Sequence, residues 1–99
     1  MSWELILLPE ALKQIAHLEN APSKKKILKA VRKTLGLMEI NLRHQSLQTH
    51  EFTSLKGVNG EKVFEAYAQQ HTPCAFRIFW YYGPKKGQIT VITITSHPK

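Results

Sequence analysis

The 99-residue sequence contains no aspartate and only one cysteine, Cys74. A single thiol cannot form an intrachain disulfide or a zinc site built from several thiolates, and such sparse cysteine suits a reducing cytoplasm. Without aspartate, a serine or cysteine nucleophile cannot have its usual aspartate-oriented histidine. We therefore expect Cys74 to be a small, buried strand residue rather than a nucleophile.

Long apolar runs are also missing. The stretch 5–8 is too short for the core of a signal peptide, and no run approaches the length of a transmembrane helix. We expect a cytoplasmic protein without membrane association. With 42% hydrophobic residues, the chain can build a modest core, and its length predicts one domain over residues 1–99.

Acidic side chains are scarce, because seven glutamates face fourteen lysines and arginines, and the formal net charge is +7. An excess of this kind favours an anionic partner such as RNA, DNA or an acidic protein. Much of it lies in one short segment, which also fits the solvated face of a helix. The clustered residues are Lys24, Lys25, Lys26, Lys29, Arg32 and Lys33.

Apolar spacing predicts two helices after a short first strand at residues 3–8. The first helix spans residues 10–19, after Pro9, and the second begins after Ser23 as its cap and extends to about Asn41. One apolar stripe defines the second helix, and its members are Ile27, Leu28, Val31, Leu35 and Met38. Residues 42–60 hold no period and are expected to form an irregular polar segment.

The last third of the chain predicts three strands joined by turns. Residues 62–69 and 74–82 alternate with period two, and 83–87 contain a glycine- and proline-rich turn. In the final strand, residues 89, 91, 93 and 95 should share one face. The predicted fold is α+β, with two N-terminal helices packed on a mainly antiparallel four-stranded sheet.

Arg77 is the most informative single residue, because it stands in an otherwise apolar or aromatic strand. A guanidinium in that setting needs an anion. Two partners are open: a phosphate group, or Glu65 on the adjacent strand. Four of the five histidines, His44, His50, His71 and His97, match no metal-binding spacing, so we expect no metal and no other cofactor.

Four short motifs, in this order of elements, resemble the RelE/ParE superfamily of toxins from bacterial type II toxin–antitoxin modules. The resemblance covers nearly the whole chain and is more specific for the fold than for the activity. The motifs are Ser54-Leu55-Lys56-Gly57, Phe64-Glu65-Ala66-Tyr67, Phe76-Arg77-Ile78-Phe79 and His97-Pro98-Lys99.

The resemblance implies a growth-inhibiting toxin of the kind associated with plasmid stabilisation, with an antitoxin protein as its partner. Members of the ribonuclease branch cut messenger RNA, usually on the ribosome, by attack of a 2′-hydroxyl on the neighbouring phosphate. That chemistry needs a proton acceptor, positive charge for the phosphorane oxygens and an acid for the leaving oxygen. The resemblance implies no metal.

The resemblance also assigns roles to individual residues. Arg77 matches the strand arginine that binds the scissile phosphate, and Lys56 matches a second basic residue. His97 lies where these enzymes place an acid–base group, and an imidazole suits proton transfer near neutral pH. Glu51 lies near the position of a general base, with its register shifted by about two residues. The residues expected to bind nucleic acid are Lys56, Tyr67, Tyr82 and Lys99.

Two departures from the family pattern favour an alternative function. Tyr67 stands where many members have arginine, and a further arginine at the end of the last strand is missing. A ParE-like protein that binds DNA gyrase, or a degenerate toxin that only binds its partner, needs neither charge. The ribonuclease reading instead requires Arg77 and His97 on one open face.

Overall fold

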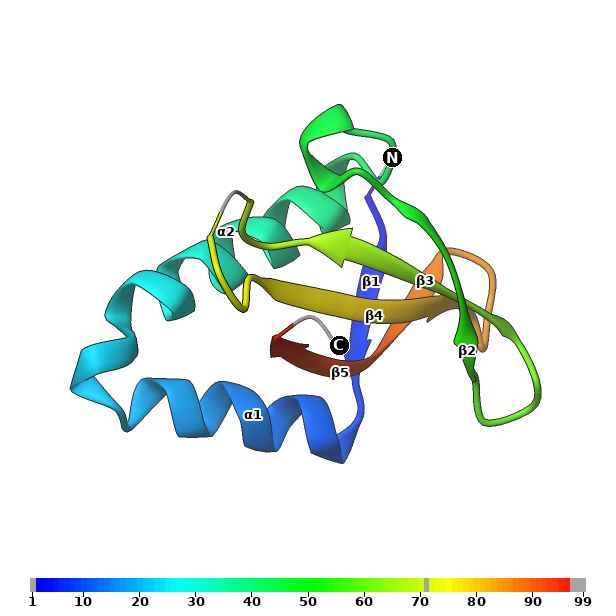
Figure 1. Ribbon diagram of the computed structural model, residues 1–99. Coiled ribbons are helices and arrows are strands. Elements are labelled where there is room, and N and C mark those ends of the chain that lie inside the picture. The colour runs from blue at the N-terminus through cyan, green and yellow to red at the C-terminus, as the bar shows by residue number, and fades with distance from the viewer. Residues whose placement is uncertain (1, 71, 97–99) are drawn as a thin grey trace.

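The computed structural model describes residues 2–70 and 72–96 of the chain, and it has the α+β architecture predicted from the sequence. The order of strand, helix, helix and further strands is confirmed (Figure 1). Two short 3₁₀ turns, Pro22–Lys24 and Gln45–Leu47, interrupt the connections. The main elements are β1 (Glu4–Leu7), α1 (Pro9–Glu19), α2 (Lys25–Ile40), β2 (His50–Lys56), β3 (Lys62–Tyr67), β4 (Phe76–Tyr82) and β5 (Gln88–Ser96).

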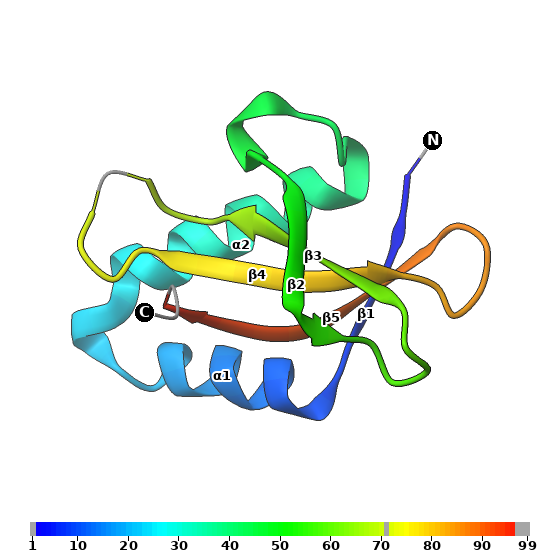
Figure 2. The same cartoon turned by 45° about the vertical axis from the view of Figure 1, so that its right-hand side comes forward.

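The sheet has five strands rather than the four that the sequence suggested, in the order β1-β5-β4-β3-β2. Strand β1 runs parallel to β5, and the other neighbours are antiparallel. The strand missed in the sequence is β2, which lies at the sheet edge and crosses in front of the other strands (Figure 2). Only Phe52 and Leu55 of its seven residues are partly buried, so it carries no alternating pattern.

Helices α1 and α2 cover one face of the sheet, with α2 behind the strands in the view of Figure 1. The predicted apolar stripe of α2 packs into this core, where Val31 and Met38 are fully buried. Helix α2 begins at Lys25, one residue later than predicted, after the 3₁₀ turn. No side chain among the described residues caps it, so the cap assigned to Ser23 was wrong. Neither helix in the described ranges is long and apolar enough to cross a membrane.

Strand β5 contains one extra residue at Ile92, because Phe79 pairs with Thr93 whereas Trp80 pairs with Val91. Such a bulge shifts the alternation of the residues that follow. Val91 and Ile94 are therefore both buried in the core, and the prediction that residues 89, 91, 93 and 95 share one face was wrong. Thr95 instead lies opposite Arg77.

Cys74 is not the buried strand residue that was predicted. It is exposed, it lies in the connection before β4, and its backbone is left-handed with φ of 54°. The strand begins two residues later, at Phe76, because the chain turns at Pro73 and Cys74 before it becomes extended.

Gln14 of α1 protects part of the outer edge of β5. Strand β1 pairs only with Gln88–Val91, and beyond this point Gln14 Oε1 accepts hydrogen bonds from the Ile94 backbone N–H (2.6 Å) and the Thr93 hydroxyl (3.0 Å). A buried N–H without an acceptor is costly, so one side chain substitutes for a missing strand here.

We expect Gln14→Leu to lower the free energy of unfolding by about 1 kcal/mol, because two hydrogen bonds to β5 are lost. Urea unfolding measures the loss, and Lys13→Ala, at an exposed position on the same helix, is the control. Hydrogen exchange shows where the stability is lost, since the Ile94 amide should exchange faster in Gln14→Leu than in the wild type. An Ile94 amide that is equally protected in both proteins contradicts this role for Gln14.

Candidate functional site

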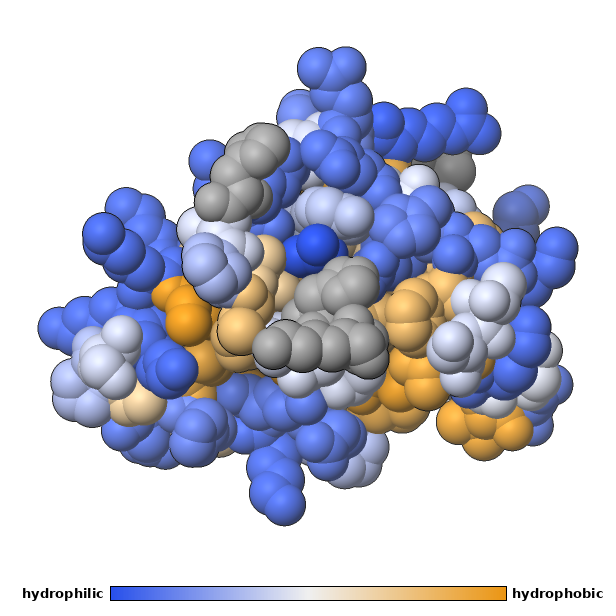
Figure 3. Space-filling model, viewed as in Figure 1, coloured by the Kyte–Doolittle hydropathy of each residue, from blue (hydrophilic) through white to orange (hydrophobic). Residues whose placement is uncertain are grey.

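Strand β4 presents different side chains to the two faces of the sheet. Ile78, Trp80 and Tyr82 point towards the core and α2, whereas Arg77 and Phe79 point to the opposite face. Apolar residues reach the molecular surface to the left and to the right of the centre in Figure 3, and polar side chains border them. Because successive side chains of a strand alternate between its two faces, Arg77 lies on the face without helices.

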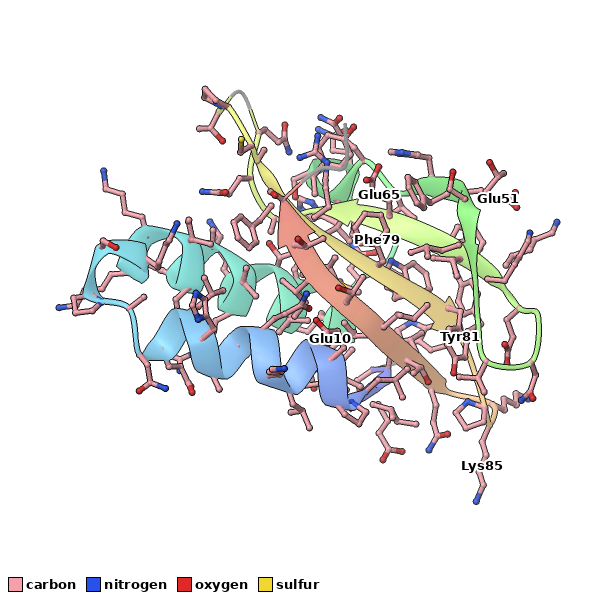
Figure 4. All side chains as sticks on the ribbon, turned by 60° about the horizontal axis from the view of Figure 1, so that its bottom comes forward. Glu10, Glu51, Glu65, Phe79, Tyr81 and Lys85 are labelled. Atoms are coloured by element: carbon pink, nitrogen blue, oxygen red, sulfur yellow. The ribbon has the colours of Figure 1, made fainter. Side chains whose placement is uncertain are left out.

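Glu65 of β3 lies beneath this face and is 1% exposed. It is paired in register with Phe79 of β4, and the two residues lie side by side in Figure 4. Its Oε1 is 2.7 Å from His50 Nε2, and its Oε2 is 4.0 Å from Arg77 Nε. A carboxylate so deeply buried is tolerated only with cationic or hydrogen-bonding partners.

His50 is the first residue of β2, and its side chain is 48% exposed. The pairing of β2 with β3 places it opposite Glu65. Its second ring nitrogen, Nδ1, is 2.9 Å from the carbonyl oxygen of Gln48. The backbone of Gln48 is left-handed, with φ of 47°, and its side-chain Nε2 donates a hydrogen bond to Gln70 Oε1. The imidazole is thus held at both nitrogens, with one edge open to solvent.

The guanidinium of Arg77 lies over the ring of Tyr67, with Cζ 3.7 Å from the ring centroid. Its Nη1 donates to the carbonyl oxygen of Ala75 at 3.2 Å, and the side chain is 11% exposed. A guanidinium over an aromatic face gains a cation–π interaction while its N–H groups, which lie in the guanidinium plane, stay available to an anion. Tyr67 thus supports Arg77 and is not a second cation.

The alternative partner of Arg77 foreseen in the sequence, Glu65, is in place, although the contact is loose. At 4.0 Å the two atoms are too far apart for a hydrogen bond, and a bidentate pair would be much closer. Glu65 therefore balances the charge of Arg77 without a hydrogen bond between its Oε2 and Arg77 Nε. The arrangement combines a nearly buried cation, a buried carboxylate and a half-exposed imidazole on one face.

The remaining predicted residues lie elsewhere. Lys56 is exposed and pairs with Lys62 at one end of β3, whereas Tyr67 and Arg77 meet at its other end, roughly 16 Å away along the strand. Glu51 is exposed and pairs with Phe64, so alternation turns it away from the face that carries Glu65. His50, its neighbour, occupies the position near the site.

Tyr82 does not share a face with Arg77. Its ring contacts the rings of Trp3, Phe64 and Trp80 at 5.4, 5.6 and 4.9 Å between centroids, on the core side of the sheet. Tyr82 is half-exposed there, beside the connection that follows α2. The aromatic run of β4 thus divides as expected between the faces, but the ring of Tyr82 packs in tilted and edge-on contacts against aromatic residues of its own chain.

His97 and Lys99, predicted as an acid–base group and a nucleic-acid contact, lie outside the described residues. Within residues 2–70 and 72–96, no three histidine, cysteine or glutamate side chains gather as metal ligands would. His50 was not predicted to lie at this site, because its only signal in the sequence is its place next to Glu51 in a segment without period.

The fold of this chain is also found in solved RelE, YoeB and YoeB/ParE structures. Three solved structures resemble this chain over nearly its full length. A chain of the archaeal RelE–RelB complex from Pyrococcus horikoshii has a TM-score of 0.64 and 12% identity, and 97% of this chain and 96% of that chain are covered. A YoeB/ParE toxin from Agrobacterium tumefaciens has a TM-score of 0.68 and 8% identity over 96% and 99% of the two chains.

The YoeB dimer from Staphylococcus aureus is similar as well, with a TM-score of 0.62 and 13% identity over 99% of this chain and 100% of that chain. No protein-family model matches the sequence. A sequence comparison with curated proteins gives no match either. At this level of identity, the likeness establishes the fold, and the chemistry has to be argued from the side chains.

Proposed function

We propose that this chain is the toxin of a type II toxin–antitoxin module, that residues 1–99 form one toxin domain, and that it cleaves messenger RNA in the cytoplasm without a metal ion. The observation that carries the proposal is Arg77, held on the Tyr67 ring on the helix-free face of a toxin fold. The net charge of +7 supports a polyanionic substrate.

In this proposal, the RNA 2′-hydroxyl attacks the adjacent phosphorus, and the bond to the 5′-oxygen breaks. Arg77 stabilises the negative charge that builds on the phosphorane oxygens. His97 exchanges the protons at the attacking and leaving oxygens. Lys56, distant from Arg77, contacts the RNA backbone beyond the cleavage point, as does Lys99. Cleavage takes place on ribosome-bound messenger RNA.

The partner in this proposal is an antitoxin protein. A structurally similar RelE chain was solved in a RelE–RelB complex, and this supports a partner of the same kind here. A second candidate function is a ParE-like toxin that binds DNA gyrase, or a degenerate toxin that binds its partner without catalysis. The low exposure of Arg77 and its proximity to Glu65 favour that alternative, since a pure binding protein can keep both groups buried.

Induced expression in a bacterial host separates these functions. We expect growth arrest together with new messenger RNA ends, and upstream fragments that carry 2′,3′-cyclic phosphates, because the 2′-hydroxyl is the nucleophile. Mapping of RNA ends after induction measures the cleavage, and the supercoiling activity of purified gyrase is measured in parallel. Inhibition of gyrase with intact messenger RNA would establish the ParE-like alternative, and absence of both effects would leave only the degenerate binder.

A further inference from the structure

A hollow of about 260 Å³ lies beside Tyr67, where α2, the end of β3 and the segment that follows α2 meet (Figure 1). Strand β2 leaves this part of the sheet uncovered, because its pairing with β3 reaches only as far as Glu65. Tyr67 therefore belongs to two neighbouring places. Its ring supports the guanidinium of Arg77, and it also lines the hollow.

Hydrogen bonds within the protein hold the walls of this hollow in place. Gln70 Nε2 donates to the carbonyl oxygen of Ser46 at 2.7 Å, and Gln70 Oε1 accepts from Gln48 Nε2 at 3.0 Å. The Thr34 hydroxyl donates to the carbonyl oxygen of Ala30 at 2.8 Å. These polar groups are satisfied without a ligand, so the hollow is formed in advance. Its apolar lining comes from Ala30, Leu37, Leu47 and Ala68.

Two groups at the hollow keep their hydrogen-bond donors available. Lys33 is exposed, and in residues 2–70 and 72–96 its ammonium group has neither a hydrogen-bond acceptor nor an acidic partner. The hydroxyl of Tyr67 makes no hydrogen bond to these residues either. A nucleotide suits such a place, because its base and ribose can lie against carbon while its phosphate takes the charged and polar donors.

Lys33 is the last of three exposed lysines on one side of α2. Lys26, Lys29 and Lys33 follow one another at i, i+3 and i+7 and span roughly 10 Å along the helix axis. Like charges at this spacing destabilise a helix, and no described glutamate pairs with these three lysines. Arg32 of the same helix, in contrast, is 2.5 Å from Glu19 of α1. The three lysines thus form an unpaired lysine stripe that ends at the hollow.

We propose that this hollow is a nucleotide subsite next to the scissile phosphate, and that the lysine stripe continues the path of single-stranded RNA along α2. Lys33 binds the phosphate of the nucleotide in the hollow, and Lys29 and Lys26 contact the phosphates beyond it. Such contacts add affinity but no choice of sequence. The inference rests on the proposed function. RNA is favoured over an acidic protein because the stripe ends at Tyr67, on which the phosphate-binding Arg77 lies.

The test uses full-length protein and a fluorescent single-stranded RNA heptamer with 2′-O-methyl groups throughout, which cannot be cleaved. We expect Lys33→Ala to weaken binding about fivefold at low salt, and to reduce the slope of log affinity against log salt by about 0.7, the value for one phosphate contact on a single strand. Replacing all three lysines of the stripe by alanine should reduce that slope by about 2. Lys33→Arg should retain most of the affinity. Lys85→Ala is the matched control, because Lys85 is exposed in the turn after β4, at the end away from Arg77 (Figure 4).

A second variant separates the hollow from the charge of the lysine stripe. Ala30→Leu places extra carbon in the hollow, keeps a good helix former in α2 and changes no charge. It should weaken heptamer binding about threefold or more, whereas binding by charge alone predicts no effect. In ¹⁵N-labelled wild-type protein, the amide resonances of Ser46, Ala68 and Gln70 should shift when the heptamer is added, since these residues line the hollow.

The outcomes distinguish the subsite from the proposed cleavage. Heptamer binding that depends on Lys33 and Ala30, without messenger RNA cleavage on induction, supports the subsite and overturns the ribonuclease. Cleavage that depends on Arg77, with wild-type heptamer binding by Lys33→Ala and Ala30→Leu, overturns the subsite alone. A wild type that does not bind the heptamer also overturns it. If Lys33→Ala binds the heptamer normally but loses affinity for a fluorescent heptaglutamate peptide, the lysine stripe serves an acidic protein, and the nucleotide subsite is overturned.

Discussion

Arg77→Ala is expected to abolish growth arrest and to reduce messenger RNA cleavage by about 10²–10³-fold, the usual effect of removing one donor to a developing oxyanion. Within the described ranges, Arg77 is the only arginine that lies on a strand, and the Tyr67 ring and Ala75 carbonyl hold it in one orientation. Arg77→Lys should recover little of the activity, because an ammonium group cannot provide the planar, stacked donors of a guanidinium.

Induction in a bacterial host followed by quantitative mapping of RNA ends measures the effect. Arg43→Ala is the matched control, since Arg43 is exposed in the connection after α2 and lies on no strand. The Arg77→Ala variant should remain folded, because His50 still contacts Glu65. The melting curve of the purified Arg77→Ala protein verifies this. Equal toxicity of Arg77→Ala and the wild type would remove the catalytic role of Arg77.

Phe79→Ala is expected to lower the free energy of unfolding by about 3–4 kcal/mol, as other deletions of fully buried phenylalanines do. Phe79 points to the face without helices, yet it is 1% exposed. The residue that helps to cover it is Phe52 of β2, whose ring centroid is 4.8 Å away in an edge-on contact. This strand therefore adds a small apolar cluster outside the main core.

Denaturant unfolding of Phe79→Ala, Phe52→Ala and the double variant measures the contact. The single Phe52→Ala change should cost less, because Phe52 is only partly buried. The coupling energy between the two positions should be about 1 kcal/mol, as for other edge-on aromatic pairs. Additive effects would show that β2 does not pack on Phe79 in solution.

Hydrophobic periodicity was sufficient to predict the helices and strands that bury one whole face. The stripe of α2 and the alternation in β3 and β4 each reflect a core facing Val31, Ala66 or Ile78. Strand β2 was not predictable in the same way, because only Phe52 and Leu55 are partly buried in this edge strand and their spacing gives no alternating pattern. The bulge at Ile92 was equally hidden, since it depends on the register with β4 and not on residue type.

The candidate site was partly predictable for a related reason. Arg77 was conspicuous because a charge in an apolar strand is unusual, and Glu65 was recognisable as a neighbour once β3 and β4 were paired. His50 could not be placed, since its position depends on the unpredicted pairing of β2 with β3. Lys56 and Arg77 were predicted to belong to one site. In the antiparallel pairing, however, Lys56 lies opposite Lys62 at one end of β3, and Arg77 lies opposite Tyr67 at the other end.

The bulge at Ile92 reconciles the sequence of β5 with its core. Ile89, Val91 and Ile94 all enter the core, a two-then-three spacing that only an additional residue permits. A deletion of Ile92 would straighten the ladder and restore plain alternation, with Ile94 still facing the core and Thr93 facing away from it. The strand should therefore tolerate the loss of this one residue better than the loss of Thr90, which would turn either Ile89 or Val91 away from the core.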